Sequence, residues 1–123
     1  MELLSIAAGG ALGAVSRFCL GNFISRIIGR ALPYGTFVIN IVGCFFMGLI
    51  MTMIIERGML SAAWRLLLCV GFLGGFTTFS SFGYETLMLL QEEKIVAALA
   101  YVGGSIILGL MSAALGVAVG KLL

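Results

Sequence analysis

Four long apolar stretches dominate this sequence of 123 residues and limit the folds open to it. A helix needs about 20 predominantly apolar residues to cross a bilayer, and four segments reach that length: Leu3–Ser25, Gly35–Ile55, Trp64–Leu90 and Ile95–Gly120. Only 10% of the residues are charged, whereas a soluble domain carries roughly 25%. The sequence therefore predicts an all-α integral membrane protein, with a single four-helix transmembrane domain over residues 1–123 in contact with membrane lipid.

Several function classes lack the residues that they require. The chain has no histidine, and its cysteines are isolated at Cys19, Cys44 and Cys69, so we expect no metal site built from Cys and His ligands. It has no carboxylate pair and no nucleophile–base constellation, so we do not expect an enzyme. The net charge is only +2 and no basic run is present, so we expect no nucleic-acid partner.

The third apolar segment contains an interruption, the stretch Gly71–Phe82, with the sequence GFLGGFTTFSSF. Three glycines and four hydroxyl side chains weaken a helix at a depth where no water satisfies freed backbone groups. Such backbone is tolerated only where it is buried in protein or lines a polar cavity. We therefore expect the third helix to be broken near its middle. Carbonyls freed around Gly74 and Gly75 are suitable ligands for a hard cation such as sodium.

Polar residues recur at helical spacing on either side of this interruption. Thr78, Ser81, Phe82 and Glu85 form one stripe, and Tyr101, Ser105 and Ser112 form another in the fourth segment. A single serine or threonine is explained by a hydroxyl that bonds back to its own helix. A continuous row of hydroxyls on one face favours a polar track. Because hydroxyls donate hydrogen bonds and Glu85 is the only acid at membrane depth, a pathway of this composition suits a small anion.

Three further side chains allow a structural or a functional interpretation. Asn40 shares a face with Thr36 and Gly43, where it could form a helix–helix hydrogen bond or line the pathway as a donor. Arg17 could anchor the first span at the membrane interface or attract anions at the mouth of a vestibule. Phenylalanines such as Phe79 usually face lipid or pack in the interior, but their interleaving with hydroxyls favours rings whose positive edges meet an anion.

The basic residues show no preference for one side of the membrane. With four spans, one side carries Arg57, Arg65 and Lys121, and the other carries Arg26, Arg30 and Lys94. Orientation follows the excess of Lys and Arg on cytoplasmic loops, and three against three gives none. We hypothesise that the protein inserts in both orientations and pairs as an antiparallel dimer. The alternative is that one loop charge dominates and fixes a single orientation.

Taken in order, three motifs resemble the CrcB/Fluc family of fluoride channels. They are the GGxxGAxxRF-like segment Gly9–Phe18, the PxGTxxxNxxG-like segment Pro33–Gly43 and the GFxGGxTTFSxF-like segment Gly71–Phe82. The likeness extends over almost the whole chain. It implies a channel for passive export of cytoplasmic fluoride, four helices per subunit, and an antiparallel dual-topology homodimer with two pores in the bacterial cytoplasmic (inner) membrane.

The resemblance also implies roles for individual residues. Phe79 and Phe82 would be the phenylalanines that line the pore, and Asn40 would be a donor to fluoride. The polar track would comprise Thr78, Ser81, Tyr101 and Ser105. Gly74 and Thr77 would give backbone carbonyls to a structural sodium ion at the dimer centre, and Arg17 would be the vestibule arginine.

Two other functions fit parts of the sequence. Small multidrug-type antiporters share the size and the four spans, but they need a carboxylate in the middle of the first span, where this chain has only Glu2 at the very end. A non-transporting partner for another membrane protein would explain the glycines. It would not explain the interleaving of hydroxyls with phenylalanines.

Overall fold

The computed structural model describes all residues from Met1 to Leu123, and every regular element in it is helical. The long helices are α1 (Glu2–Ile28), α2 (Tyr34–Ile55) and α6 (Ile95–Leu122). The third span is made of four consecutive elements: α3 (Ala62–Trp64), the π-helical segment η1 (Arg65–Leu73), α4 (Gly74–Phe76) and α5 (Phe79–Gln91). Four helical spans are long and apolar enough to cross a membrane, which confirms the predicted fold class at this level.

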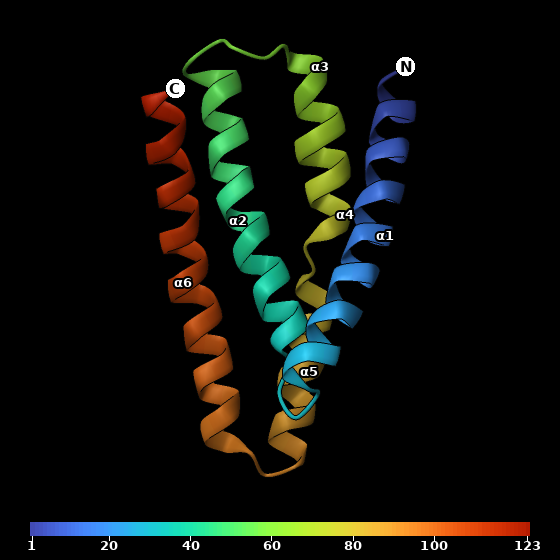
Figure 1. Ribbon diagram of the computed structural model, residues 1–123, viewed down its shortest axis with the longest axis vertical. Helices are drawn as coiled ribbons and strands as arrows, with labels where there is room; N and C mark the ends of the chain where they lie inside the picture. Colours follow the sequence, from blue (N-terminus) through green and yellow to red (C-terminus); the bar gives the residue numbers. More distant parts are fainter.

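Both termini and the loop between α2 and α3 lie at one end of the molecule (Figure 1). The α1–α2 and α5–α6 connections lie at the other end. These connections turn at residues with left-handed backbone: Gly29 after α1 has φ +102°, and Glu93 before α6 has φ +62°. Pro33 directly precedes α2, where the backbone N–H that proline lacks would have had no helical partner.

Helices α1 and η1 approach each other through glycines. A Cβ atom added at Gly9 would clash with the Leu67 carbonyl oxygen, and one at Gly13 would clash with the carbonyl of Phe72. Close backbone approach of this kind is how helices associate in lipid, where little hydrophobic driving force is available. These glycines therefore fix α1 against the first half of the third span.

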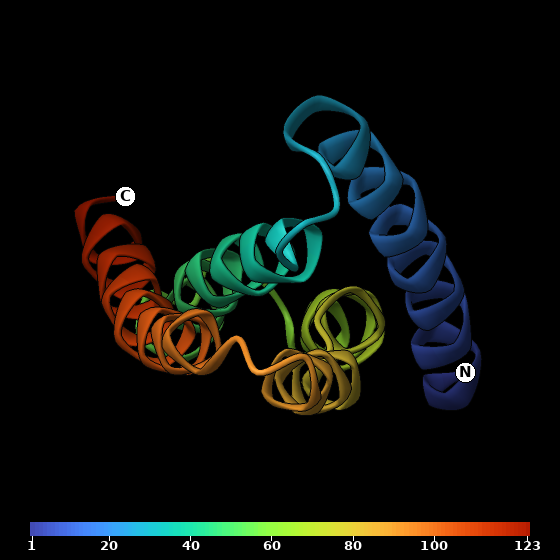
Figure 2. The ribbon, with the colours of Figure 1, turned by 90° about the horizontal axis from the view of Figure 1, so that it is seen from below.

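Helix α2 packs along α6 in the same manner. Gly48 faces the Ala113 backbone, and Gly116 faces the Phe45 backbone. The Ser112 hydroxyl donates a hydrogen bond of 2.8 Å to the Ile41 carbonyl. Viewed from below, α2 and the third span separate α1 from α6 (Figure 2), so α2 is the central helix of the subunit.

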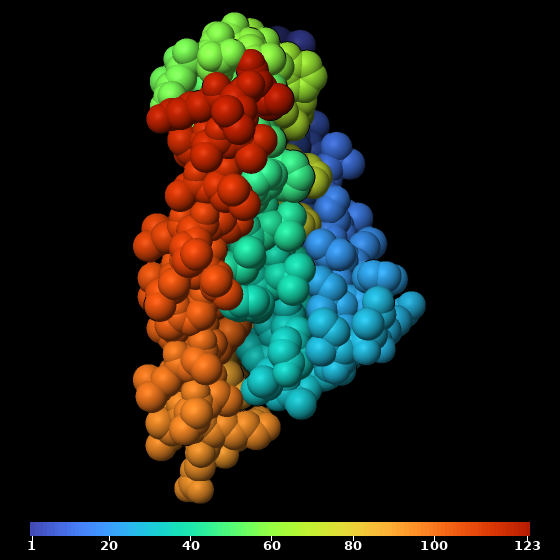
Figure 3. All heavy atoms as spheres, turned by 60° about the vertical axis from the view of Figure 1, so that its left-hand side comes forward, coloured from blue at the N-terminus to red at the C-terminus, as the bar shows by residue number.

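Few residues are fully buried within the single subunit. Only 19 of 123 residues are buried, in agreement with a surface that meets lipid or another protein chain. A small cluster at the centre joins Ile39, Leu73 and Phe76, and a second near the lower end joins Leu89, Ala98 and Tyr101. The space-filling view shows α6 lying along α2, with α1 beyond it (Figure 3).

Candidate functional site

The helical hydrogen-bond pattern of the third span is interrupted at Thr77 and Thr78. Thr77 has φ −80° and ψ +158°, and Thr78 has φ −149° and ψ +121°, so both residues are extended. Asn40 on α2 bonds to the Thr78 backbone twice: its Nδ2 donates to the Thr78 carbonyl at 3.0 Å, and its Oδ1 accepts the Thr78 N–H at 2.9 Å. Asn40 thus forms a helix–helix hydrogen bond that holds the extended segment, and its second amide N–H remains available.

The two threonine hydroxyls terminate the helices on either side. The Thr77 hydroxyl donates to the Leu73 carbonyl at 2.8 Å, at the end of the preceding turn. The Thr78 hydroxyl accepts the Ser81 N–H at 3.1 Å and so serves as the N-cap of α5. Such a cap satisfies one of the N–H groups that have no partner at a helix start. The helix therefore resumes at Phe79, one residue after the start of the stripe expected from the sequence.

This arrangement leaves backbone carbonyls without their usual helical donors. The N–H of Thr78 would close a helical turn on the Gly74 carbonyl, but it donates to Asn40 instead. The N–H of Ser81 would close a helical turn on the Thr77 carbonyl, but it donates to the Thr78 hydroxyl instead. Neutral carbonyl oxygens at a helix break are suitable ligands for a sodium ion. No cluster of three or more His, Cys, Asp or Glu side chains is present for a transition metal.

A pocket of about 340 Å³ lies beside the extended segment, and we call it the phenylalanine pocket. Its walls include Asn40, Thr77, Thr78, Phe79, Phe82 and Ser105. The Phe79 and Phe82 rings lie 5.9 Å apart with an interplanar angle of 43°, and Phe82 lies 5.1 Å from the Tyr101 ring. Phe79 is 82% exposed in the single subunit, so one wall of this pocket is open to whatever covers that face.

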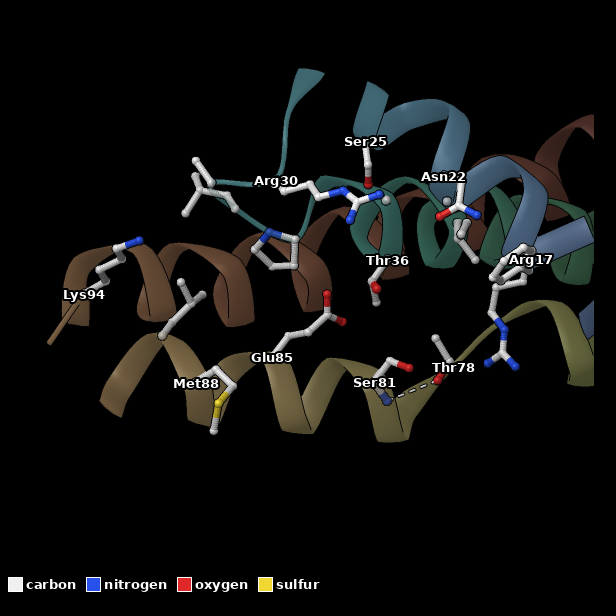
Figure 4. Close-up of a pocket in the computed structure, with 18 of the residues that line it drawn as sticks. Arg17, Asn22, Ser25, Arg30, Thr36, Thr78, Ser81, Glu85, Met88 and Lys94 are labelled. Carbon is white, nitrogen blue, oxygen red and sulfur yellow. Dashed lines mark hydrogen bonds between the residues drawn. The ribbon is translucent and has the colours of Figure 1, made fainter. Parts of the chain in front are cut away.

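A second, larger hollow of about 660 Å³ opens toward the end where α1 joins α2, and we call it the arginine cleft. Residues of α1, including Arg17, form one wall, and residues of α5, including Ser81 and Glu85, form another (Figure 4). Thr78 lines both the arginine cleft and the phenylalanine pocket. Thr78 therefore stands between the two spaces, at the interruption of the third span.

Three buried polar atoms near these spaces make no hydrogen bond within the chain: Glu85 Oε1, the Tyr101 hydroxyl and Ser105 Oγ. A polar atom buried without a partner is costly unless water or a ligand satisfies it. The Glu85 carboxylate points across the cleft toward Thr36 (Figure 4). Glu85 was not among the site residues expected from the sequence, although its spacing of four from Ser81 was a signal that it faces the same space.

The structure brings most of the expected site residues together. Arg17, Thr78 and Ser81 line the arginine cleft, and Asn40, Phe79, Phe82 and Ser105 line the phenylalanine pocket with Thr78. Tyr101 lines neither space. It packs against Phe82 and borders a separate apolar pocket with Phe37. Gly74 is exposed at the surface of the single subunit, and Thr77 is half-buried.

A comparison with protein families gives one match over most of the chain. The model described as CrcB-like protein, Camphor Resistance (CrcB), matches residues 4–117. The chain belongs to the CrcB-like family. This membership confirms the resemblance carried by the three motifs, and it makes the chain a multi-pass membrane protein.

Curated relatives of this family member are similar over nearly their full length. A protein of Acidobacterium capsulatum is 46% identical over 98% of this chain and 97% of its own. Relatives from Chloroflexus aurantiacus and Geotalea uraniireducens are 45% and 46% identical, over 98% of this chain and 95% and 98% of their own. Each is named "Fluoride-specific ion channel FluC". That name denotes an ion channel, which confirms the expectation that the family is not one of enzymes.

Proposed function

We propose that this protein is a fluoride-selective channel that lowers cytoplasmic fluoride by passive export and thereby gives fluoride resistance. One observation carries the proposal. Thr78 lines both the arginine cleft and the phenylalanine pocket, so cationic, hydroxyl and aromatic groups lie on the two sides of one residue at the interruption of the third span. The relatives from three bacteria, each named as a fluoride-specific channel, support the choice of ion.

The driving force needs no pump. Hydrofluoric acid is a weak, neutral acid, so it crosses lipid and ionises in the less acidic cytoplasm, where the anion is trapped. An inside-negative potential drives the anion outward with about 2.3 kcal/mol per charge per 100 mV. An open anion pathway across the cytoplasmic membrane therefore lowers internal fluoride without coupling to ATP or protons.

Each group in the pathway has a task set by its chemistry. Arg17 attracts the anion into the cleft, and the hydroxyls of Thr78 and Ser81 replace part of its water shell by donating hydrogen bonds. The positive edges of the Phe79 and Phe82 rings attract the ion weakly, which permits release as well as entry. The free N–H of Asn40 and the hydroxyl of Ser105 supply further donors in the phenylalanine pocket, and the Tyr101 ring supports Phe82 from behind.

The pore that we propose is completed by a second, antiparallel copy of the chain. The 82% exposure of Phe79 supports this arrangement, because a ring that must meet an ion cannot be left facing lipid. Exposed Gly74 lies near the same interruption. The nearly balanced basic residues of the two ends also favour both insertion orientations. Two copies related in this way would give two pores.

A sodium ion is the group that we propose to hold the two interruptions together. The carbonyls of Gly74 and Thr77 would hold it, since their usual helical donors are used by Asn40 and Thr78. When bound, the ion would supply a positive charge that satisfies these oxygens inside a low-dielectric environment. Its role is structural, because the pathway residues do not depend on it for their own chemistry.

The direct test is efflux from potassium-loaded liposomes that contain the purified protein, with valinomycin present so that potassium can follow the anion. Fluoride released into the bath is followed with a fluoride electrode, and chloride is followed in parallel vesicles. We expect rapid fluoride release and little chloride release. Equal rates for the two halides, or fluoride release no faster than from protein-free vesicles, would refute the proposal.

A further inference from the structure

Arg30 lies at the outer end of the arginine cleft, although it belongs to the loop that follows α1. Gly29 ends α1 with φ +102°, a conformation that side-chain-bearing residues rarely adopt. The reversal that follows directs the Arg30 side chain over the cleft (Figure 4). Arg26, one helical turn before the loop, does not line the cleft.

The charges of the cleft leave Arg30 without a counter-charge. Five ionisable side chains line the space: Arg17, Arg30, Lys94, Glu85 and Glu92. Lys94 forms an ion pair of 3.1 Å with Glu92, and the only other ion pair of the chain joins Lys121 to Glu56. Arg17 and Arg30 are therefore both unpaired, and Glu85 is the one acid in the cleft that no cation neutralises.

Two polar side chains of α1, Asn22 and Ser25, lie between the two arginines (Figure 4). Both line the cleft, and neither side chain makes a hydrogen bond within the chain. Amide N–H and hydroxyl groups donate to anions. The loop after α1 and the α1 wall thus offer a cation, a hydroxyl, an amide and a second cation in sequence from the mouth inward.

We propose that Arg30 is a second anion-recruiting residue, which raises the local fluoride concentration at the mouth and passes the ion along Ser25 and Asn22 to Arg17. This inference rests on the proposed fluoride channel and assigns a role that the family motifs do not include. Fixed charge at a cleft mouth concentrates counter-ions locally. The contribution of Arg30 is therefore largest in dilute salt and fades when the Debye length falls to a few ångströms.

Single-channel conductance in planar bilayers tests this role, because only folded channels are counted. The recordings use symmetric 20 mM sodium fluoride, with and without 0.5 M sodium isethionate as a screening salt. We expect Arg30→Gln to lower the conductance about two- to threefold in dilute salt, which is the effect of one unit charge on an ion roughly 8 Å away in water. In the screening salt we expect the conductance to stay almost unchanged. Arg30→Lys should restore the conductance, and Arg26→Gln is the matched control.

The outcomes separate the inference from the proposed function. If wild type conducts fluoride but Arg30→Gln matches it in dilute salt, the role of Arg30 is refuted and the channel function stands. The role is also refuted if Arg26→Gln lowers the conductance as much as Arg30→Gln, or if the loss persists in the screening salt. If wild type conducts no fluoride, both the channel function and the role of Arg30 fail.

Discussion

The side chain of Asn40 replaces a helical neighbour for the backbone of Thr78, by donating to its carbonyl at 3.0 Å and accepting its N–H at 2.9 Å. This pair of bonds allows an extended residue to persist between α4 and α5. Backbone groups at membrane depth require partners inside the protein. Asn40 supplies them from a neighbouring helix, so it stabilises the interruption on which the rest of the site depends.

Loss of this contact is expected to destabilise the fold. Asn40→Ala leaves the Thr78 N–H and carbonyl unsatisfied, at a cost of about 1–3 kcal/mol. Unfolding in a mixed-micelle denaturant titration measures the change. Asn22→Ala is the matched control, since the Asn22 side chain makes no hydrogen bond within the chain. Equal unfolding midpoints for the two variants would contradict the bracing role of Asn40.

Replacing Phe79 or Phe82, which we propose line the pore, by isoleucine is expected to abolish fluoride efflux. Bulk is nearly kept, but the positive ring edge is lost. The two variants should differ in the packing that they lose within one subunit, because Phe79 is 82% exposed there while Phe82 packs 5.1 Å from Tyr101. In the unfolding of the single subunit, Phe82→Ile should lose roughly 1 kcal/mol, and Phe79→Ile should lose less. Liposome flux that persists in either variant would argue against the ring-edge role.

Because α1 packs closely against η1, substitution by alanine should destabilise the fold at one glycine of α1 and be tolerated at another. A Cβ at Gly13 clashes with the Phe72 carbonyl, whereas a Cβ at Gly10 meets only Gly71 O at 3.8 Å. We expect Gly13→Ala to cost about 1–3 kcal/mol by overpacking and Gly10→Ala to be nearly neutral. The same denaturant titration reports both values. A neutral Gly13→Ala would show that α1 can move away from the third span at no cost.

Sodium removal is expected to weaken the dimer if the Gly74 and Thr77 carbonyls hold the ion. Purification in N-methylglucamine salts should lower the melting temperature and raise the monomer fraction on size-exclusion chromatography. Return of sodium should reverse both changes, and potassium should do so less well. Identical melting in the two salts would count against the site.

Dual topology predicts half-labelling from either face of the membrane. In a variant without Cys19, Cys44 and Cys69, a single cysteine replaces Met59, which is 52% exposed in the α2–α3 loop. A second variant places it at Ala31, at the opposite end. An impermeant maleimide should reach about half of each population in intact cells. One site fully labelled and the other untouched would indicate a single orientation.

The sequence predicted the spans well because hydrophobic length is a local property. The first was expected over Leu3–Ser25 and forms a helix over Glu2–Ile28, and the second was expected over Gly35–Ile55 and forms Tyr34–Ile55. The cluster of glycines and hydroxyls in the third span predicted an interruption of the helix, and Thr77 and Thr78 have extended backbone there. The π-helical turns of η1 were not predicted, and the glycines of α1 pack closely against this segment.

Pairings across the bundle were harder to predict than the residues involved. The pattern left Asn40 with two interpretations, and only the position of α5 relative to α2 shows that Thr78 is its partner. Ser112 was expected on a continuous polar face, yet it donates to the Ile41 carbonyl between α2 and α6. The hydroxyls of Tyr101 and Ser105 have no hydrogen-bond partner in the chain. Which hydroxyl bonds to protein and which stays free is a tertiary property that periodicity does not specify.

Passive fluoride movement is the central claim, and charge-limited efflux tests it most directly. Vesicles loaded with potassium fluoride and this protein are diluted into fluoride-free buffer that contains an electrode. Because an uncoupled anion pathway builds up an opposing voltage, we expect little release until valinomycin lets potassium follow, and then rapid release. Vesicles that retain their fluoride after valinomycin is added would contradict the account.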